Sequence, residues 1–190
     1  MSEKLVALHN NIVTCQACGF FKEQWRFSQE THGNHLADVM VVGESAYKPS
    51  IEVGKYYSAG VLRNTLTGTV DLEQQCYLTD VVKCDKSFLE TKEQLEAAAL
   101  HCRHFLLEEV EVVQPKVIIA VGELAFRYLT GISGAFTGRQ DDGETYLYKN
   151  TPVIPIVHPS YGNVHYGKRP WQSGGYHSSV RKIFIQALRM

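Results

Sequence analysis

The sequence lacks the features that would place the protein in a membrane or in a secretory pathway. No apolar run approaches the length of a membrane-spanning helix, and the first residues, Met1-Ser2-Glu3-Lys4, do not have the layout of a signal peptide. Internal repeats, low-complexity tracts and a strong excess of charge are also missing, since the formal net charge is −1. This balance disfavours a general polyanion binder but permits a local basic face for DNA. We therefore expect a cytoplasmic protein with no membrane partner.

The composition is that of an ordinary globular protein, without the signature of a disordered chain. At 190 residues the chain can bury a full hydrophobic core, and no linker divides it. We expect a single domain over residues 1–190, acting as a monomer.

Near-continuous apolar segments alternate with segments of helical periodicity. This pattern predicts an α/β fold, in which helices cover both faces of a mainly parallel sheet. We expect strands at residues 38–42, 76–82, 116–121 and 153–157, with a short one at 145–148. We expect helices at residues 3–13, 59–66, 92–112 and 122–129, and a C-terminal helix capped by Ser178 or Ser179. The first helix is expected to bury Leu5, Leu8, Ile12 and Val13.

Four of the five cysteines indicate an inorganic centre. Cys15 and Cys18 form a C-x-x-C pair, Cys84 follows a predicted strand, and Cys102 lies in a predicted helix. Four thiolates can close a tetrahedral zinc site or hold an iron–sulfur cluster. In a chain without a secretory signal, metal binding is favoured over disulfides.

The remaining cysteine and the histidines carry less information. Cys76 opens a predicted strand, and we interpret it as a small buried core residue. No histidine stands at a metal-ligand spacing. His101 and His104 flank Cys102 and are expected at the surface or around the metal centre.

Polar residues gather where predicted strands end. Gly43-Glu44 follows the first strand, Asp80 to Cys84 ends the second, and His158-Pro159-Ser160 follows the fourth core strand. In parallel sheets, ligands bind beyond the carboxyl ends of the strands. The sequence therefore predicts a binding site at this edge of the sheet.

Taken together, these residues resemble the uracil-DNA glycosylase superfamily, and most of all its iron–sulfur branch, usually called family four. The resemblance covers nearly the whole chain, and the cysteine spacing matches. Five motifs follow in the family's order. Residues 43–47 read G-E-S-A-Y where the family has G-E-(A/G)-P-G, residues 54–57 read G-K-Y-Y where it has G-R-P-F, and residues 80–84 read D-V-V-K-C where it has N-V-V-K-C. The segments P-K-V-I-I-A-V-G at 115–122 and H-P-S at 158–160 match the family's third core strand and its H-P-S motif.

The resemblance implies a three-layer α/β/α sandwich around a four-stranded, mainly parallel sheet, with DNA as the partner. It also implies that a 4Fe–4S cluster on Cys15, Cys18, Cys84 and Cys102 pins the N-terminal arm, the loop after the second strand and the long helix together. Structural zinc is the alternative occupant.

The activity implied by the resemblance is that of a monofunctional DNA glycosylase, which flips a base out of DNA and leaves an abasic site. His158 would hydrogen-bond the base O2 and stabilise the departing base as an anion. Glu44, or Glu52, would position water or stabilise the sugar cation. The acidic run that follows the family's loop is replaced here by Lys48-Pro49-Ser50-Ile51, which leaves the water-activating carboxylate open.

The resemblance also assigns residues to the base and to the DNA strand. Gly43, Ser45 and Tyr47 would face the base, through backbone amides of the loop, and Tyr57 would stack on it. After H-P-S, a long segment rich in glycine and aromatic residues would wedge the duplex open and meet phosphates, through Ser160, Tyr161, Lys168 and Arg169.

Asp80 departs from the family at the position of its pyrimidine-reading asparagine. An asparagine amide offers uracil one donor and one acceptor, whereas an ionised aspartate only accepts. It would repel uracil O4 and accept from the exocyclic amine of cytosine. Because excision of ordinary cytosine would destroy the cell's own genome, the expected target is a modified cytosine, such as one in hypermodified phage DNA, which suits antiviral defence.

Other interpretations stay open for these residues and for the whole chain. Asp80 could cap a turn or pair with Lys83, Glu44 could bond loop amides, and His158 could be structural. Tyr57 could be a packing residue, and Lys168-Arg169 a solvated turn. The alternative functions are uracil excision in DNA repair, a non-catalytic or DNA-trapping relative, and a zinc-stabilised nucleotide-binding module.

Overall fold

The structure is a computed structural model that describes residues 2–19, 32–46, 60–85, 89, 91–133, 145–159 and 175–190. Its elements follow in the order α1 (Glu3–Thr14), β1 (Val39–Ala46), α3 (Val61–Leu66), α4 (Leu72–Gln75), β2 (Cys76–Asp85), α5 (Lys92–Val113), β3 (Val117–Val121), α6 (Glu123–Thr130), β4 (Tyr146–Tyr148), β5 (Thr151–Ile156) and α8 (Gly175–Ala187). No helix in this part of the chain is both long and apolar enough to cross a membrane.

The centre of the fold is a five-stranded sheet in the order β2-β1-β3-β5-β4. β1 pairs in parallel with β2 and β3, and β3 pairs in parallel with β5. These are the four core strands that the sequence predicts. β4 adds a fifth, antiparallel strand, because only Lys149 and Asn150 separate it from β5 and so short a connection allows only a hairpin.

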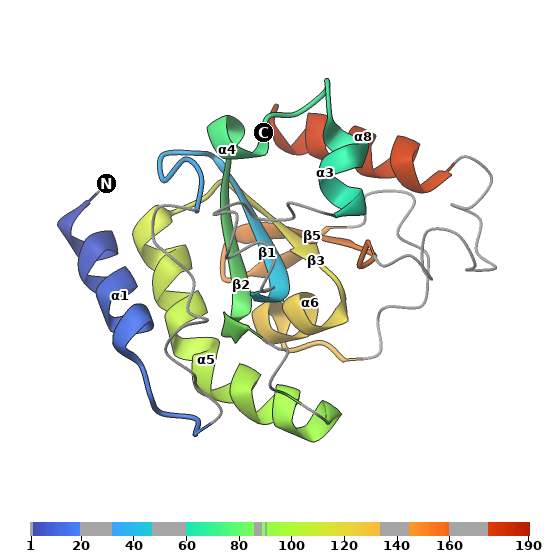
Figure 1. Cartoon of the computed structure of the whole chain (residues 1–190). Coiled ribbons are helices and arrows are strands. Elements are labelled where there is room, and N and C mark those ends of the chain that lie inside the picture. Colours follow the sequence, from blue (N-terminus) through green and yellow to red (C-terminus); the bar gives the residue numbers. More distant parts are fainter. Residues whose placement is uncertain are drawn as a thin grey trace.

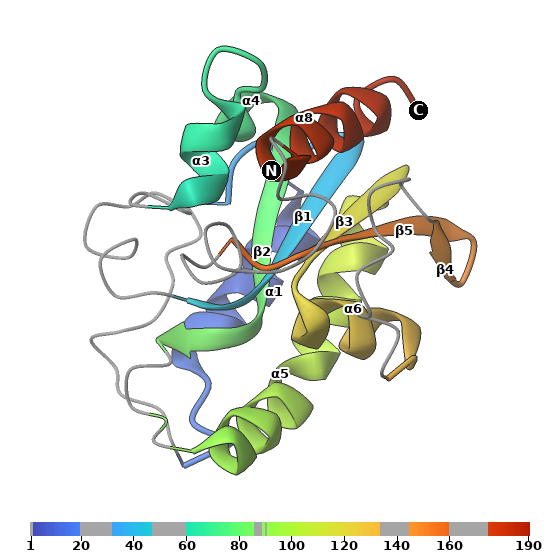
Figure 2. The same cartoon turned by 90° about the vertical axis from the view of Figure 1, so that its right-hand side faces the viewer.

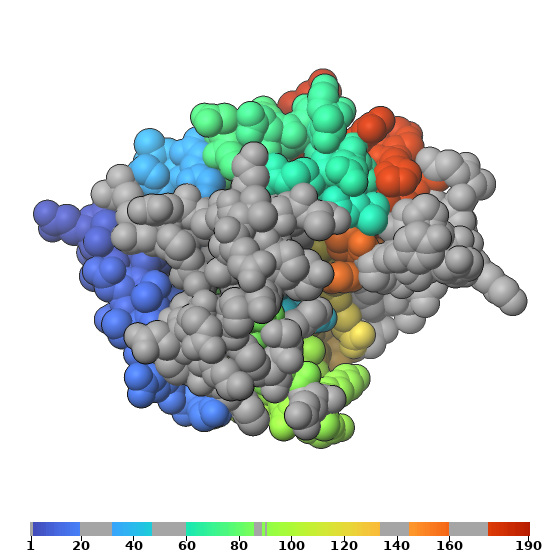
Figure 3. Space-filling model, in the orientation of Figure 1, coloured from blue at the N-terminus to red at the C-terminus, as the bar shows by residue number. Residues whose placement is uncertain are grey.

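Helices cover both faces of the sheet, which confirms the predicted three-layer arrangement (Figures 1 and 2). α3 and α8 cover one face, where Leu62 and Phe184 pack against the strands. α1, α5 and α6 cover the other face, where Leu106 and Phe126 belong to the core. In Figure 3, α1 forms the flank of the molecule at the left of the view. The four parallel strands are buried from both sides, which explains their near-continuous apolar sequences.

The helix ends follow local sequence signals in most cases. Thr91 begins α5 with a capping box, in which its side chain accepts from the Gln94 amide at 3.2 Å and the Gln94 side chain accepts from the Thr91 amide at 3.3 Å. α5 ends at Val113. The next residue, Gln114, caps the helix with a φ of 52° and is followed by Pro115. The predicted cap and length of this helix are confirmed.

The first helix buries a slightly different face from the predicted one. Leu5, Leu8 and Ile12 are buried as expected, but the fourth buried residue is His9. Val13 is 37 % exposed, so its predicted burial was wrong. Val13 lies one position past Ile12, about 100° further round the helix, which takes it off the inward face.

The C-terminal helix begins earlier than the sequence predicts. α8 starts at Gly175, so Ser178 and Ser179 lie inside it and do not cap it. The Tyr176 side chain is 4 % exposed, belongs to the core, and donates a hydrogen bond from its hydroxyl to the Val157 carbonyl at 3.4 Å. Tertiary burial of this ring outweighs the local capping signal.

Candidate active site

Four cysteines from separate parts of the chain line one small pocket. Cys15 and Cys18 follow α1, Cys84 lies in β2, and Cys102 lies in α5. The complete lining is Ile12, Cys15, Cys18, Lys83, Cys84, His101, Cys102 and Phe105. Cys102 is buried, the other three are half-buried, and all four are free of disulfides. Four thiols around one space are the donor set that an iron–sulfur cluster or a tetrahedral zinc ion requires, so the residues fit the implied group.

Cys76, the fifth cysteine, is separate from this pocket. It is fully buried in the core on the face that α3 and α8 cover. Burial, together with the nearby charges of Asp71 and Glu73, raises the pKa of its thiol to about 12. Its predicted role as a small core residue is confirmed.

A bulge in β2 brings Cys84 to the pocket. Along the pairing with β1, successive residues Ser45 and Ala46 lie opposite Val82 and Asp85, so Lys83 and Cys84 are extra on β2. A bulge bends a strand and increases its twist. Both extra residues line the cysteine pocket. The strand predicted to end at residue 82 therefore continues to Asp85, with the metal-ligating candidate inside it.

Lys83 is the centre of a buried polar network behind this bulge. Its side chain is 4 % exposed, and its Nζ donates to the Thr79 hydroxyl and to the Asp80 carbonyl, each at 2.6 Å. It also forms an ion pair with Glu109 of α5, which is fully buried. Glu109 accepts further hydrogen bonds from the Tyr77 hydroxyl at 3.0 Å and from the Thr79 hydroxyl at 2.8 Å. Burial raises the pKa of Glu109, but the Lys83 ammonium, the hydrogen bond of His9 and the charge of His32 together outweigh it, and the net pKa is about 2.

Two histidines extend the network to α1. His9 stacks on His32 with 4.4 Å between ring centroids, and His9 Nε2 is hydrogen-bonded to the Tyr77 hydroxyl at 2.8 Å. Ligand atoms of His9, His32 and Glu109 lie within 4.8 Å of one another, a spacing that could hold a metal ion. The Oε2 oxygen of Glu109 is already paired with the Lys83 ammonium, however, and the Oε1 oxygen accepts from the Tyr77 hydroxyl, so a cation would compete with both. We interpret the group as a structural link between α1, β2 and α5.

Asp80 and Gly43 lie side by side at the carboxyl end of the sheet. They are directly opposite each other in the β1–β2 pairing, and Asp80 is 4 % exposed. Cys76 and Leu78, two and four residues before Asp80, face the core that α3 and α8 cover. Alternation along β2 puts Asp80 on that same face, opposite to the network of Lys83.

The segment after Gly43 is a strand where the sequence predicted a loop. β1 continues to Ala46 and stays paired with β2. Its pairing with β3 ends at Val42 in the part of the chain that the structure describes, so the end of β1 projects past β3. Glu44 and Ser45 are half-buried there. Among the described residues, the buried Ser45 hydroxyl has no hydrogen-bond partner, which leaves it available to a ligand.

His158 lies two residues after the last residue of β5 and is half-buried. Gly122, the residue after β3, packs against it: a Cβ built there would lie 3.3 Å from the His158 Cβ. Gly122 has a φ of +95°, and its amide donates to the Ile156 carbonyl at 2.8 Å. The hydroxyl of Tyr176 fixes the neighbouring carbonyl of Val157 from α8. The sequence included Gly122 in a strand motif but did not show that it supports His158.

The structure thus gathers Asp80, Gly43 and His158 at the carboxyl end of the sheet, and it gathers the four cysteines beside β2. β2 and β5 are separated by β1 and β3, so the strands that lead to Asp80 and to His158 are three strand spacings apart, about 14 Å. The other predicted site residues lie outside the described residues, namely Tyr47, Glu52, Tyr57, Ser160, Tyr161, Lys168 and Arg169.

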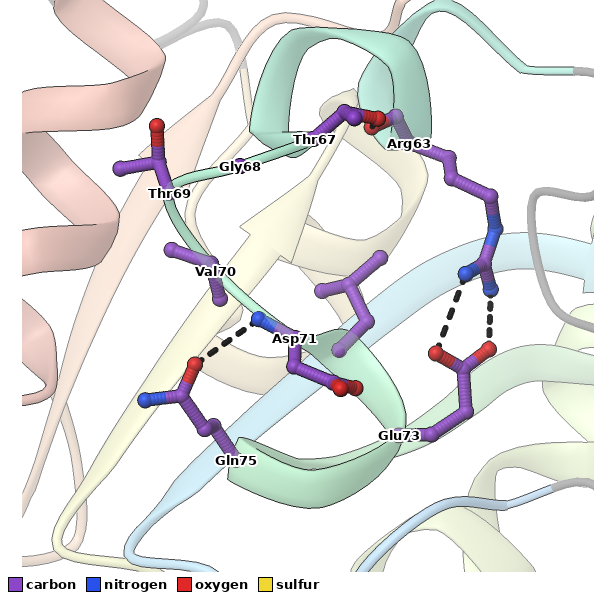
Figure 4. A pocket seen from close by; sticks show the side chains of 9 residues that line it. Arg63, Thr67, Gly68, Thr69, Val70, Asp71, Glu73 and Gln75 are labelled. Atoms are coloured by element: carbon purple, nitrogen blue, oxygen red, sulfur yellow. Dashed lines mark hydrogen bonds and ion pairs between the residues drawn. The ribbon is translucent and has the colours of Figure 1, made fainter.

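A second hollow lies between α3 and α4, before β2 begins (Figure 4). Its one arginine, Arg63, donates to Glu73 from both terminal nitrogens. Asp71 caps α4 by accepting from the Gln74 amide. These groups satisfy one another, and the hollow is at the end of β2 opposite to Cys84, so we assign it no role in the site.

Comparisons with known proteins agree with the resemblance. The sequence profile of the Uracil DNA glycosylase superfamily matches residues 30–178. A Type-4 uracil-DNA glycosylase of Archaeoglobus fulgidus is 26 % identical, over 95 % of this chain and 92 % of its own. A Type-4 uracil-DNA glycosylase of Thermotoga maritima is 31 % identical over 68 % of each chain. A Type-5 uracil-DNA glycosylase of Pyrobaculum aerophilum is 35 % identical over 51 % of this chain and 42 % of its own.

Proposed function

The chain belongs to the uracil-DNA glycosylase superfamily, and from this premise we propose that it is a monofunctional DNA glycosylase whose target is a modified cytosine. The enzyme hydrolyses the N-glycosidic bond of a base flipped out of DNA and leaves an abasic site. The names of its relatives support glycosylase activity. The choice of base is argued from the site.

Asp80 carries the choice of base. Its side chain is buried at the carboxyl end of the sheet, next to the side-chain-free position of Gly43. An ionised carboxylate in that place accepts the hydrogen bond of the cytosine N4 amine, and it repels the O4 oxygen of uracil. A substituent on the cytosine ring would distinguish foreign DNA from the cell's own, which suits a role in defence against phage.

His158 approaches the base from the other side of the site. Its half-buried imidazole, held by Gly122 after the neighbouring strand β3, would donate to the base O2. Negative charge grows on the base as the glycosidic bond breaks, and a fixed donor at O2 stabilises it. Glu44 is the candidate for positioning water or stabilising the sugar cation, and the Ser45 hydroxyl is a candidate donor to the base.

The four cysteines would hold a 4Fe–4S cluster, which supplies cross-links between segments and no chemical step. Cys15 and Cys18 bring the end of α1, Cys84 brings β2, and Cys102 brings α5. The bound cluster would fix the bulge four residues from Asp80. We further propose that the protein is a cytoplasmic monomer that acts on DNA.

Base release tests the proposed function directly. Oligonucleotides containing cytosine, uracil, 5-hydroxymethylcytosine or its glucosylated form are incubated with the protein, and abasic sites are revealed by alkali. Cleavage at a modified cytosine, with plain cytosine intact, is expected. Cleavage at uracil alone would contradict the role of Asp80 and leave uracil repair as the function. DNA binding or covalent trapping without base release would show a non-catalytic relative.

A further inference from the structure

We propose that Lys83 is a positioning residue that couples the four-cysteine pocket to the base-reading carboxylate of Asp80. This inference rests on the proposed function of Asp80. Lys83 stands beside Cys84 in the bulge, and its Nζ lies 2.6 Å from the carbonyl oxygen of Asp80. One side chain therefore contacts the backbone of the base-reading residue and is adjacent in sequence to a metal-ligating residue.

The ammonium of Lys83 is fully used within the fold. It has three N–H donors, and its three acceptors are the Thr79 hydroxyl, the Asp80 carbonyl and the Glu109 carboxylate. Two of these acceptors belong to β2 and the third to α5. A tetrahedral group with every donor engaged restrains both elements in a single arrangement.

Stability alone does not explain this pair. Burying both charges carries a large desolvation cost, so a buried ion pair often stabilises a protein no more than apolar residues of the same size would. Lys83 is 4 % exposed and Glu109 is fully buried. The pair provides directional contacts that set the shape of a strand. An apolar pair would not provide them.

The strand in question needs such a restraint. β2 is the outermost strand of the sheet. Among the described residues, its outer side is bridged by residues 32–34, through the pair Gly33 and Tyr77, three residues before Asp80, and its pairing with β1 is interrupted by the bulge. The Asp80 side chain faces the site while Lys83 holds the Asp80 carbonyl from the face of α5. A shift of the bulge, for example on loss of the metal centre, is therefore transmitted to the position of the Asp80 carboxylate.

Binding selectivity tests the coupling without requiring hydrolysis. The readout is the ratio of dissociation constants for oligonucleotides that carry 2′-fluoro-5-hydroxymethylcytidine or 2′-fluorouridine, which resist cleavage. The double variant K83M/E109Q removes Lys83 and leaves a neutral amide that can still bond Tyr77 and Thr79. E96Q/R127M is the matched control, because it neutralises another ion pair of α5, with Arg127 of α6.

We expect K83M/E109Q to reduce the preference for the modified cytosine by about five- to ten-fold, and E96Q/R127M to keep it within about two-fold. The single variant E109Q retains the contact between Lys83 and Asp80 but leaves the ammonium without its carboxylate. It should be less stable than K83M/E109Q in thermal unfolding and yet keep the preference. Stability and selectivity then rank these two variants in opposite orders, which a purely structural role of Lys83 would not produce.

Several results would overturn the coupling: an unchanged preference in K83M/E109Q, an equal loss in E96Q/R127M, or a preference that follows stability across the variants. Absence of any preference in the unmodified protein would also overturn it. Base release by the unmodified protein is scored separately, so a failure of the proposed function is distinguishable from a failure of the coupling.

Discussion

Gly122 and His158 are in such close contact that a side chain on Gly122 would press against the histidine. A Cβ on Gly122 would lie 3.3 Å from the Cβ and 3.5 Å from the Cδ2 of His158. The φ of Gly122, +95°, is also one that other residues rarely adopt. The end of β3 therefore fixes the place of the histidine that follows β5.

Substitution of Gly122 by alanine should displace His158. We expect G122A to lose about 1–2 kcal/mol of stability from backbone strain, and base release to slow by about ten-fold or more because the donor to the base moves. Urea unfolding and single-turnover base release measure the two effects.

Gly131, at the other end of α6, provides the control. Its φ is +75°, and nothing lies within 4 Å of a Cβ built there. G131A should therefore lose similar stability and keep its rate. Equal loss of rate in both variants would show that strain, and not the contact with His158, is responsible.

Exchange of Asp80 for asparagine should move the selectivity toward uracil. The amide offers one donor and one acceptor, which match O4 and N3–H of uracil, and the change in selectivity should be about ten- to a hundred-fold. Competition assays with uracil and modified-cytosine oligonucleotides measure it. D85N is the control, because Asp85 is also buried in β2 but lies beyond the bulge. Unchanged selectivity in D80N would argue that Asp80 does not read the base.

Loss of one pocket cysteine should remove the metal centre, whereas loss of Cys76 should not. C102S removes a ligand from the pocket, and C76A removes a thiol from the core on the other face of the sheet. We expect anaerobically purified C102S to lose bound iron, sulfide and visible absorbance, and C76A to keep them. Finding zinc but no iron in the unmodified protein would mean that the pocket holds a zinc ion and not a cluster. Retention of iron by C102S would contradict the ligand set.

The Glu109–Lys83 pair should give the fold an acid-sensitive component. Glu109 has a pKa of about 2 in the folded protein, against 4.5 for a free glutamate. Above pH 4.5 its carboxylate is ionised in both states, and its contribution of about 3 kcal/mol is complete. As the pH falls from 4.5 to about 2, the unfolded chain takes up a proton that the folded protein does not, so the stabilisation is lost.

The measurement is urea unfolding over this pH range for the unmodified protein and for K83M/E109Q. As the pH falls, the free energy of unfolding of the unmodified protein should decrease relative to that of K83M/E109Q, because the variant has no carboxylate at position 109. A constant difference would contradict the low pKa of Glu109.

The sequence predicted the architecture well because buried parallel strands have an unmistakable apolar pattern. Residues 38–42, 116–121 and 153–157 lie almost where β1, β3 and β5 were found. The cysteine set was also predictable, since the pocket gathers the four that the spacing indicated. The places of His158 and Asp80, after and within predicted strands, were predictable as well.

What the sequence did not reveal depends on contacts between distant segments. Lys83 and Glu109 are 26 residues apart, and neither stands in a pattern that indicates burial of its charge. The pairing of His9 with His32 and Tyr77 joins three separate segments in the same way. The extension of β1 to Ala46 and the early start of α8 were missed because tertiary packing overrode the local signals.

The bulge in β2 also limits how the length of this strand can vary. Side chains alternate between the two faces with a period of two, so two extra residues leave the strand in phase, and Asp85 resumes the pairing at Ala46. Deleting either Lys83 or Cys84 alone would put the end of β2 out of phase. Deleting both would restore an uninterrupted strand that keeps Asp80 opposite Gly43 but has no fourth cysteine. Such a deletion would remove a pocket cysteine together with the lysine that holds the Asp80 carbonyl, so the same two codons set both the cysteine pocket and the position of Asp80.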